Sequence, residues 1–335
     1  MKKNIFVIIF LVTLLFILLC FTTYVMAEQK ESFFEGKNLI ITTPGSPGGG
    51  MDTYSRLIGK VLAKELKANF LVQNAATMYQ AIVQFKNAKP NGLTITTFTM
   101  PGLIIAQLLG TEGIGTFDLR EITYIGRIES EPSVFYVGQK SGITSYQDIV
   151  SANKEIKMGF AALSNDDYFF SKIETDLLGI KMKPIAGFQG GGGVNLSVIK
   201  GEIDGSQSSY SSARTLINNK EVIPIFVLAS ERLPELPDVP TILELVSDEK
   251  KDLVLKIIKL AELGRCSLAV SKEVPLDRVE ELRRAFFVAI NSKELLDEAA
   301  KLKRPINPME GEKLQEMVQF IFNSSDLIKI VETLK

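Results

Sequence analysis

A glycine-rich stretch between an apolar run and an amphipathic run is the strongest constraint on the fold of this chain. Residues 38–43 are apolar and β-branched, which predicts a short buried strand. In residues 53–67 the apolar side chains recur at helical spacing, which predicts a helix with one buried face. The connecting residues, 43–52, read Thr-Pro-Gly-Ser-Pro-Gly-Gly-Gly-Met-Asp. The pattern therefore predicts a strand, a tight glycine-rich turn and a helix.

The same turn is a candidate anion site. Consecutive glycines leave the backbone unshielded, and the first N–H groups of the predicted helix have no partners within it. Together with the helix dipole these groups attract a negative charge. Asp52 is placed to cap or orient the first turn. The alternative is a turn that holds no ligand, and the glycine spacing fits neither of the common nucleotide-binding motifs.

A second unit of the same kind follows about 140 residues later in the chain. Residues 187–193, Gly-Phe-Gln-Gly-Gly-Gly-Gly, follow a strand-like run and precede the predicted helix 194–200. Two such units facing each other would form a cleft with backbone amides on both walls, where ligands of open α/β sheets bind. Phe188 is placed to cover an apolar part of a ligand, with a position in the core as the alternative.

The rest of the chain alternates between strand-like and helix-like segments. Further strands are predicted at 70–73, 93–98, 134–137, 156–160, 184–186 and 223–229. Further helices are predicted at 168–178, 211–218, 276–291 and from residue 311 onward. This alternation favours an α/β architecture with largely parallel sheets.

Composition excludes several functional classes. The chain has 335 residues, 46% of them hydrophobic, with 38 basic and 39 acidic residues, so it can bury a large core and has no basic tract for nucleic acid. It contains no His, which removes the commonest general base and metal ligand. Its two cysteines are Cys20 and Cys266. We therefore predict no catalytic residues, no metal site, no cofactor and no enzymatic activity.

The first 27 residues resemble an export signal. Lys2 and Lys3 precede an apolar run from residue 5 to about 20, and Val25-Met26-Ala27 offers a cleavage site after Ala27. The alternatives are an uncleaved membrane anchor and a lipoprotein signal that uses Cys20. All three place the remaining chain in the periplasm or at the outer face of the cytoplasmic membrane.

Five stretches of the sequence resemble a known family from about residue 37 to the C-terminus. These are the first glycine-rich loop with Asp52, the step Ala-Lys-Pro-Asn-Gly-Leu-Thr at 88–94, Phe188-Gln-Gly-Gly with Lys-Gly-Glu-Ile-Asp at 200–204, Ser-Glu-Arg-Leu-Pro-Glu-Leu-Pro-Asp-Val-Pro-Thr at 230–241, and residues 299–312. They are similar to the substrate-binding proteins of tripartite tricarboxylate transporters, the Bug or TctC-like extracytoplasmic solute receptors.

The resemblance implies a two-lobed periplasmic-binding-protein-like fold of type II, with crossed connections and a ligand cleft between the lobes. Residues 36–137 and 262–335 would form lobe 1, and residues 138–261 lobe 2. The ligand would be a small organic acid, held mainly by backbone amides and ordered water. A monomer that closes by a hinge motion would deliver it to the membrane permease of the transporter.

The candidate ligand-binding residues come from loops of both lobes. They are Pro47, Gly48, Gly49, Gly50, Met51, Asp52, Asn74, Thr99, Ser164, Asn165, Asp166, Phe188, Gly190, Gly191 and Ser208.

Two loops depart from the family pattern. Residues 74–78 read Asn-Ala-Ala-Thr-Met where the family usually has Asn followed by Pro and several glycines, and residues 161–167 read Ala-Ala-Leu-Ser-Asn-Asp-Asp instead of a Ser- and Gly-rich segment. An Asp166 carboxylate near the anion site would repel a ligand carboxylate. Either Asp166 points away as a helix cap, or the ligand also carries a positive group, as an amino acid or another zwitterion does.

Three other functions remain open from the sequence. A sensory receptor that presents its ligand to a membrane kinase would have the same fold. A secreted hydrolase with a serine nucleophile and a surface protein without a ligand are the other two.

Overall fold

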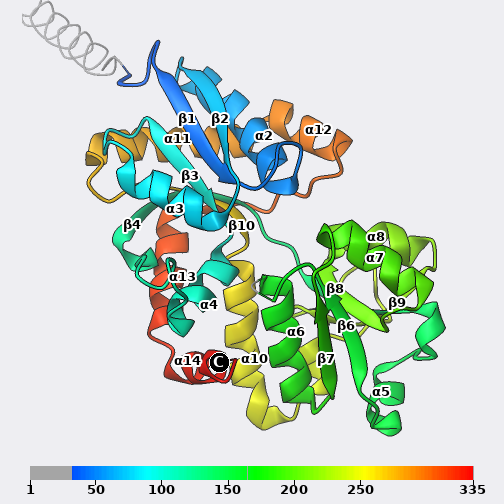
Figure 1. The fold of residues 1–335 in the computed structure, drawn as a ribbon. Helices are drawn as coiled ribbons and strands as arrows, with labels where there is room; N and C mark the ends of the chain where they lie inside the picture. Colours follow the sequence, from blue (N-terminus) through cyan, green and yellow to red (C-terminus); the bar gives the residue numbers. More distant parts are fainter. Residues whose placement is uncertain (1–31, 164, 335) are drawn as a thin grey trace, which may run out of the picture.

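The computed structural model describes residues 32–163 and 165–334, which form two lobes, each built around one β-sheet (Figure 1). The predicted export segment, residues 1–27, lies outside the described residues. In the described part of the chain, no helix combines the length and the apolar character that crossing a membrane requires.

The strands divide between a six-stranded and a five-stranded sheet. Sheet A has the order β11 (Met309–Glu310), β4 (Ile122–Glu129), β10 (Arg265–Ser271), β3 (Thr94–Phe98), β1 (Asn38–Pro44) and β2 (Asn69–Ala75). Sheet B has the order β7 (Met182–Ala186), β6 (Ile156–Phe160), β8 (Gly205–Ser209), β5 (Ser133–Gly138) and β9 (Val222–Leu228).

Helices surround both sheets (Figure 1). The helices that precede β8 in the chain are α2 (Gly50–Glu65), α3 (Met78–Asn87), α4 (Met100–Leu109), α5 (Tyr146–Ala152), α6 (Asp166–Leu178) and α7 (Gly190–Lys200). Those that follow it are α8 (Tyr210–Asn218), α9 (Ile242–Leu245), α10 (Asp248–Glu262), α11 (Leu276–Ile290), α12 (Lys293–Lys301), α13 (Gly311–Phe322) and α14 (Ser325–Glu332). Two short 3-10 turns occupy Leu119–Glu121 and Gln139–Ser141.

The predicted two-lobed α/β fold is confirmed, but the expectation of largely parallel sheets is wrong. In sheet A, β1 pairs in parallel with β2 and β3, whereas β10 runs antiparallel to β3 and β4. In sheet B, β6 pairs in parallel with β7 and β8, whereas β5 runs antiparallel to β8 and β9. The antiparallel strands β5 and β10 each enter a sheet after the chain has crossed from the other lobe. Their direction is therefore not set by a strand–helix–strand unit.

The two crossings define where the lobes meet. The first lies between Glu129 at the end of β4 and Ser133 at the start of β5. The second lies between β9 and β10, which are joined through α9 and α10. The division into lobes at residues 137 and 262 stays a prediction. Strand β5, most of which falls within the predicted lobe 1, pairs with β8 and β9 in sheet B.

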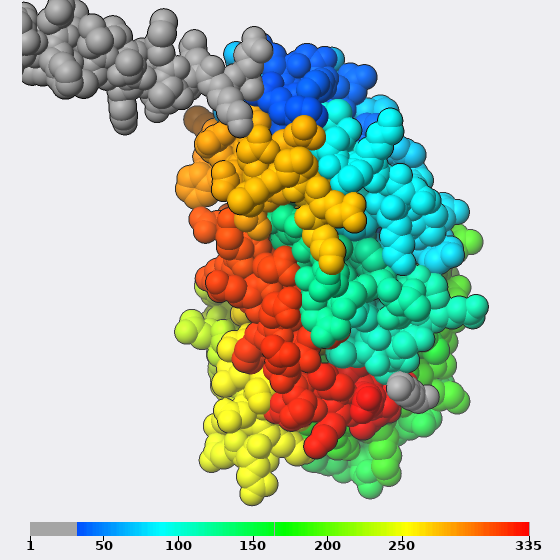
Figure 2. All heavy atoms as spheres, turned by 90° about the vertical axis from the view of Figure 1, so that its left-hand side faces the viewer, coloured from blue at the N-terminus to red at the C-terminus, as the bar shows by residue number. Residues whose placement is uncertain are grey.

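Apolar packing holds both lobes and also joins them. One cluster lies between sheet A and helices such as α2 and α11, with Ile58, Leu62 and Phe286 buried in it. A second cluster contains residues of both sheets, among them Phe98 from β3 and Phe226 from β9. Helix α13 packs against β4, and α14 packs against α4 and α10, so the red C-terminal segment lies along these elements in Figure 2. The lobes thus share an apolar core beside the cleft described below.

Helix α11 offers a matched test of this packing. Leu282 is fully buried against the first cluster, whereas Leu276 on the same helix is 68% exposed. We expect Leu282→Ala to lower the free energy of unfolding by about 2–5 kcal/mol because it leaves a cavity. Leu276→Ala should change it by no more than about 0.5 kcal/mol. Urea unfolding measures both, and equal midpoints for the two variants would contradict the buried position of α11.

Candidate functional site

A cleft lies between the two lobes. Its main cavity has a volume of about 550 Å³ and a neighbouring cavity has about 260 Å³. The first lobe contributes residues of α2, α4, β4 and β10 to the main cavity, and the second lobe contributes the first turns of α6 and α8. Asn165, Asp167, Ser212 and Arg265 line both cavities. The two cavities therefore adjoin, and the main cavity has the size of a small-molecule site.

The structure brings many of the predicted ligand-binding residues to this cleft. Those that line one of its two cavities are Gly50, Met51, Thr99, Asn165, Asp166, Gly190, Gly191 and Ser208. Those that line neither cavity are Pro47, Gly48, Gly49, Asp52, Asn74 and Phe188. Ser164 lies outside the described residues. A role of any of them in binding stays a prediction.

The first glycine-rich loop is fixed by the chain's own carboxylate. Asp52 is buried and accepts hydrogen bonds from the Gly48 N–H, at 2.9 Å, and from the Asn74 amide, at 3.0 Å. It also forms an ion pair with Arg56 at 2.9 Å. Burial opposes its ionisation, but these three hydrogen-bond donors hold the pKa of Asp52 below its usual value. Asp52 therefore orients the loop, whereas Gly50 and Met51 at the start of α2 face the cleft.

The second glycine-rich loop presents the open start of a helix to the cleft. Gly190 and Gly191 in the first turn of α7 line the smaller cavity, together with Asn195 of the same helix and Ser206 and Ser208 on β8. The first N–H groups of a helix lack partners within it and favour an anion. This wall of the cleft is therefore suited to a carboxylate.

Phe188 is half-buried beside the start of α7. Its ring packs on a small apolar cluster that includes Val194 and Val198 of α7. It therefore supports the base of α7, and it does not line either cavity.

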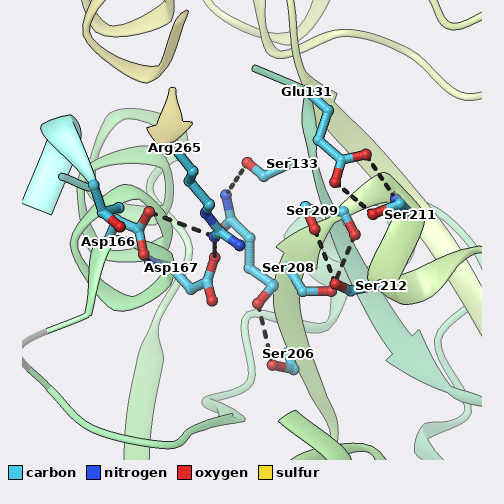
Figure 3. A network of polar contacts seen from close by, with 12 residues as sticks. Glu131, Ser133, Asp166, Asp167, Ser206, Ser208, Ser209, Ser211, Ser212 and Arg265 are labelled. Carbon is cyan, nitrogen blue, oxygen red and sulfur yellow. Dashed lines mark hydrogen bonds and ion pairs between the residues drawn. The ribbon is translucent and has the colours of Figure 1, made fainter. Parts of the chain in front are cut away.

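Arg265 of β10 lies at the centre of the cleft, between two carboxylates from the other lobe (Figure 3). Its guanidinium is 3.4 Å from an oxygen of Asp166 and 3.3 Å from an oxygen of Asp167, both in the first turn of α6. The cap position of α6 is Asn165, so the expectation that Asp166 points away as the cap is wrong. These ion pairs connect the two lobes across the cleft.

Three further carboxylates surround this ion pair. Glu129 lies opposite Arg265 in the pairing of β4 with β10 and is only 3% exposed. Glu131 accepts hydrogen bonds from the backbone N–H and the hydroxyl of Ser211, in the first turn of α8. Glu174 on α6 accepts a hydrogen bond from Gln207 on β8 at 3.1 Å, and its second oxygen has no hydrogen-bond partner among the described residues.

Glu129, Glu131 and Arg265 are not among the site residues that the sequence predicts. No motif contains them, and Arg265 lies more than 130 residues from the two glutamates along the chain. Only the pairing of β4 with β10 and the crossing after β4 bring them together.

The buried carboxyl groups keep their protons at unusually high pH. Burial raises the pKa of Glu129 to about 7, although Arg265 acts against this shift. Burial also raises the pKa of Glu174 to about 8. The pKa of Asp167 is raised by burial and by the neighbouring charge of Asp166. Because an ionised group in this enclosed space lacks hydration, the cleft holds protons close to neutral pH.

Glu174 should make the stability of the protein depend on pH. Its pKa in the folded protein is about 8, against an ordinary value of 4.5, so its contribution to stability is greatest at low pH and is lost as the pH rises between these values. We expect Glu174→Gln to reduce this loss, because the substituted side chain cannot ionise. Urea unfolding at about pH 5 and pH 8 tests this. Glu249→Gln, on the exposed face of α10, is the control, and an unchanged difference between the two pH values in Glu174→Gln would refute the assignment.

Comparison with known proteins supports the interpretation of the fold. No family model matches the chain. An Agrobacterium vitis protein, described as the UPF0065 protein in the TAR-I ttuE-ttuC' intergenic region, is 24% identical over 301 residues, which are 85% of this chain and 81% of that protein.

Solved structures resemble the chain over nearly all of its length. A TctC solute binding protein from Polaromonas, without ligand, has a TM-score of 0.69 at 19% identity and covers 89% of this chain and 97% of its own. The R. palustris protein Rpa4515 with adipate has a TM-score of 0.68 at 18% identity and covers 88% and 97%. The resemblance that the sequence motifs indicate is thereby confirmed, and the chain is similar in fold to the TctC-like solute-binding proteins.

Proposed function

We propose that the protein is an exported solute receptor that captures a small carboxylate-bearing ligand between its lobes. It would deliver the ligand to the permease of a tripartite tricarboxylate-type transporter. The observation that carries this proposal is the pair of adjoining cavities between the lobes, the smaller of which is lined by the first turn of α7. The similar fold of an R. palustris protein with adipate supports an organic acid as the ligand.

The second cavity supplies the groups that recognise a carboxylate. The first amides of α7 attract negative charge, and the amide nitrogen of Asn195 offers a further hydrogen-bond donor, because its oxygen accepts from the Tyr136 hydroxyl. Main-chain donors are rigid, so a carboxylate can be bound there with little loss of conformational freedom. Export through residues 1–27, action as a monomer and the absence of enzymatic activity complete the proposal.

Ligand binding should stabilise the protein. A ligand present at about 100 times its dissociation constant adds about 2.7 kcal/mol to the free energy of unfolding. We expect at least one small carboxylate in a thermal-shift screen of the purified protein to raise its melting temperature by several degrees. The absence of any shift across mono-, di- and tricarboxylates and amino acids would count against a receptor function.

Neighbouring glycines of α7 provide a test of the carboxylate wall. A side chain added at Gly191 or Gly192 meets no atom within 4 Å, and only Gly191 lines the cavity. We therefore expect Gly191→Val to weaken binding of a carboxylate found in the screen by about tenfold or more, because its side chain enters the space in front of the amides. Gly192→Val is the matched control for folding. Calorimetric titration that shows equal affinity for the two variants would place the carboxylate elsewhere.

A further inference from the structure

A small recess with a volume of about 30 Å³ adjoins the main cavity, and Arg265 lines both. Such a volume holds about one water molecule or one ammonium group. Its wall contains the four carboxylates Glu129, Glu131, Asp166 and Asp167, which also line the main cavity. We call this space the acidic recess.

Most of these carboxylates already have partners. Asp166 and Asp167 share Arg265, and Glu131 is bound to Ser211. Glu129 differs, because among the described residues its side chain makes no hydrogen bond and no ion pair, although it is only 3% exposed. A buried carboxyl group without a partner favours its protonated form, and a positive group of a ligand would favour its ionised form.

Acidic side chains outnumber basic ones in the cleft. The main cavity is lined by four acids, Glu129, Glu131, Asp166 and Asp167, and by two guanidinium groups, those of Arg265 and Arg304. Within the described residues no group of three or more acidic or sulfur side chains is arranged to hold a metal ion. An organic cation therefore fits the recess better than a divalent metal.

We propose that the ligand carries an amino group as well as its carboxylate, and that this ammonium lies in the acidic recess beside Glu129. This inference rests on the proposed receptor function and specifies its ligand class as amino-carboxylate zwitterions. The carboxylate end would bind at the start of α7, in the cavity that adjoins the main one and shares Asn165, Asp167, Ser212 and Arg265 with it. A dicarboxylate without an amino group would leave Glu129 unpaired and would face the repulsion of its neighbours.

Ammonium binding would also change the protonation of Glu129. Burial raises the pKa of Glu129 to about 7, so near neutral pH the empty cleft holds a proton that a bound ammonium displaces. The charged and titratable groups that act on Glu129 from neighbouring elements are Arg127, Glu131, Asp166, Arg265, Cys266 and Tyr54. Affinity for a zwitterion should therefore rise with pH between about 5 and 8, with proton release on binding.

Matched ligand pairs test the proposal. We would compare glutarate with glutamate, butyrate with 4-aminobutyrate and hexanoate with 6-aminohexanoate by calorimetric titration in two buffers of different ionisation enthalpy. In at least one pair the amino compound should bind about tenfold or more tightly, with proton release. Glu129→Gln should reduce this preference to within about threefold. The control Glu249→Gln, which is exposed on α10, should retain the preference.

The outcomes separate this inference from the receptor function. Carboxylates that bind as well as their amino partners, in the wild type, would overturn the zwitterion proposal and leave the receptor function intact. Absence of binding by every compound would count against the receptor function itself. If Glu129→Gln fails to fold, Asp167→Asn in the same recess replaces it, and an undiminished preference in that variant would refute the recess as the ammonium site.

Discussion

The ion pairs between Arg265 and the first turn of α6 connect the two lobes at the centre of the cleft. They can form because β10 returns from the second lobe into sheet A, which places Arg265 opposite Glu129 and facing α6. One guanidinium thus pairs with two carboxylates of the other lobe. The cleft is consequently a region of competing charges.

The helix N-termini around the cleft differ in whether a carboxylate of the chain is already hydrogen-bonded to them. The Asp52 carboxylate accepts a hydrogen bond from a backbone amide of the loop before α2. In the same way, Asp166 accepts one from the N–H of Asp167 in α6, and Glu131 accepts one from the N–H of Ser211 in α8. Among these starts and that of α7, only the glycine-rich turn of α7 has no carboxylate of the chain bound to it in the described residues. A ligand carboxylate therefore meets least competition there, and the opposite, acidic side of the cleft favours a positive group.

Much of the fold follows from local pattern. The strand–turn–helix units at residues 38–67 and 184–200 form as the sequence predicts, because apolar periodicity and glycine turns act over a few residues. The sequence does not predict strand β8, since its residues Gly-Ser-Gln-Ser-Ser are polar. The strand forms because β5 and β6 pair with its two edges, and α6, α7 and α8 pack against it. The mixed strand directions likewise depend on the crossings between lobes, which no local pattern encodes.

The sequence by itself determined the two glycine-rich turns, the predicted export segment, the absence of His and the resemblance to a receptor family. It also indicated a conflict at Asp166, and left open whether that residue points away or faces a positive group. Only the tertiary structure decided that Asp166 faces Arg265 and that Glu129 and Glu131 join it around one recess. The physical reason is that charge acts through space: strand register and the crossings between lobes bring together residues that are far apart in the chain.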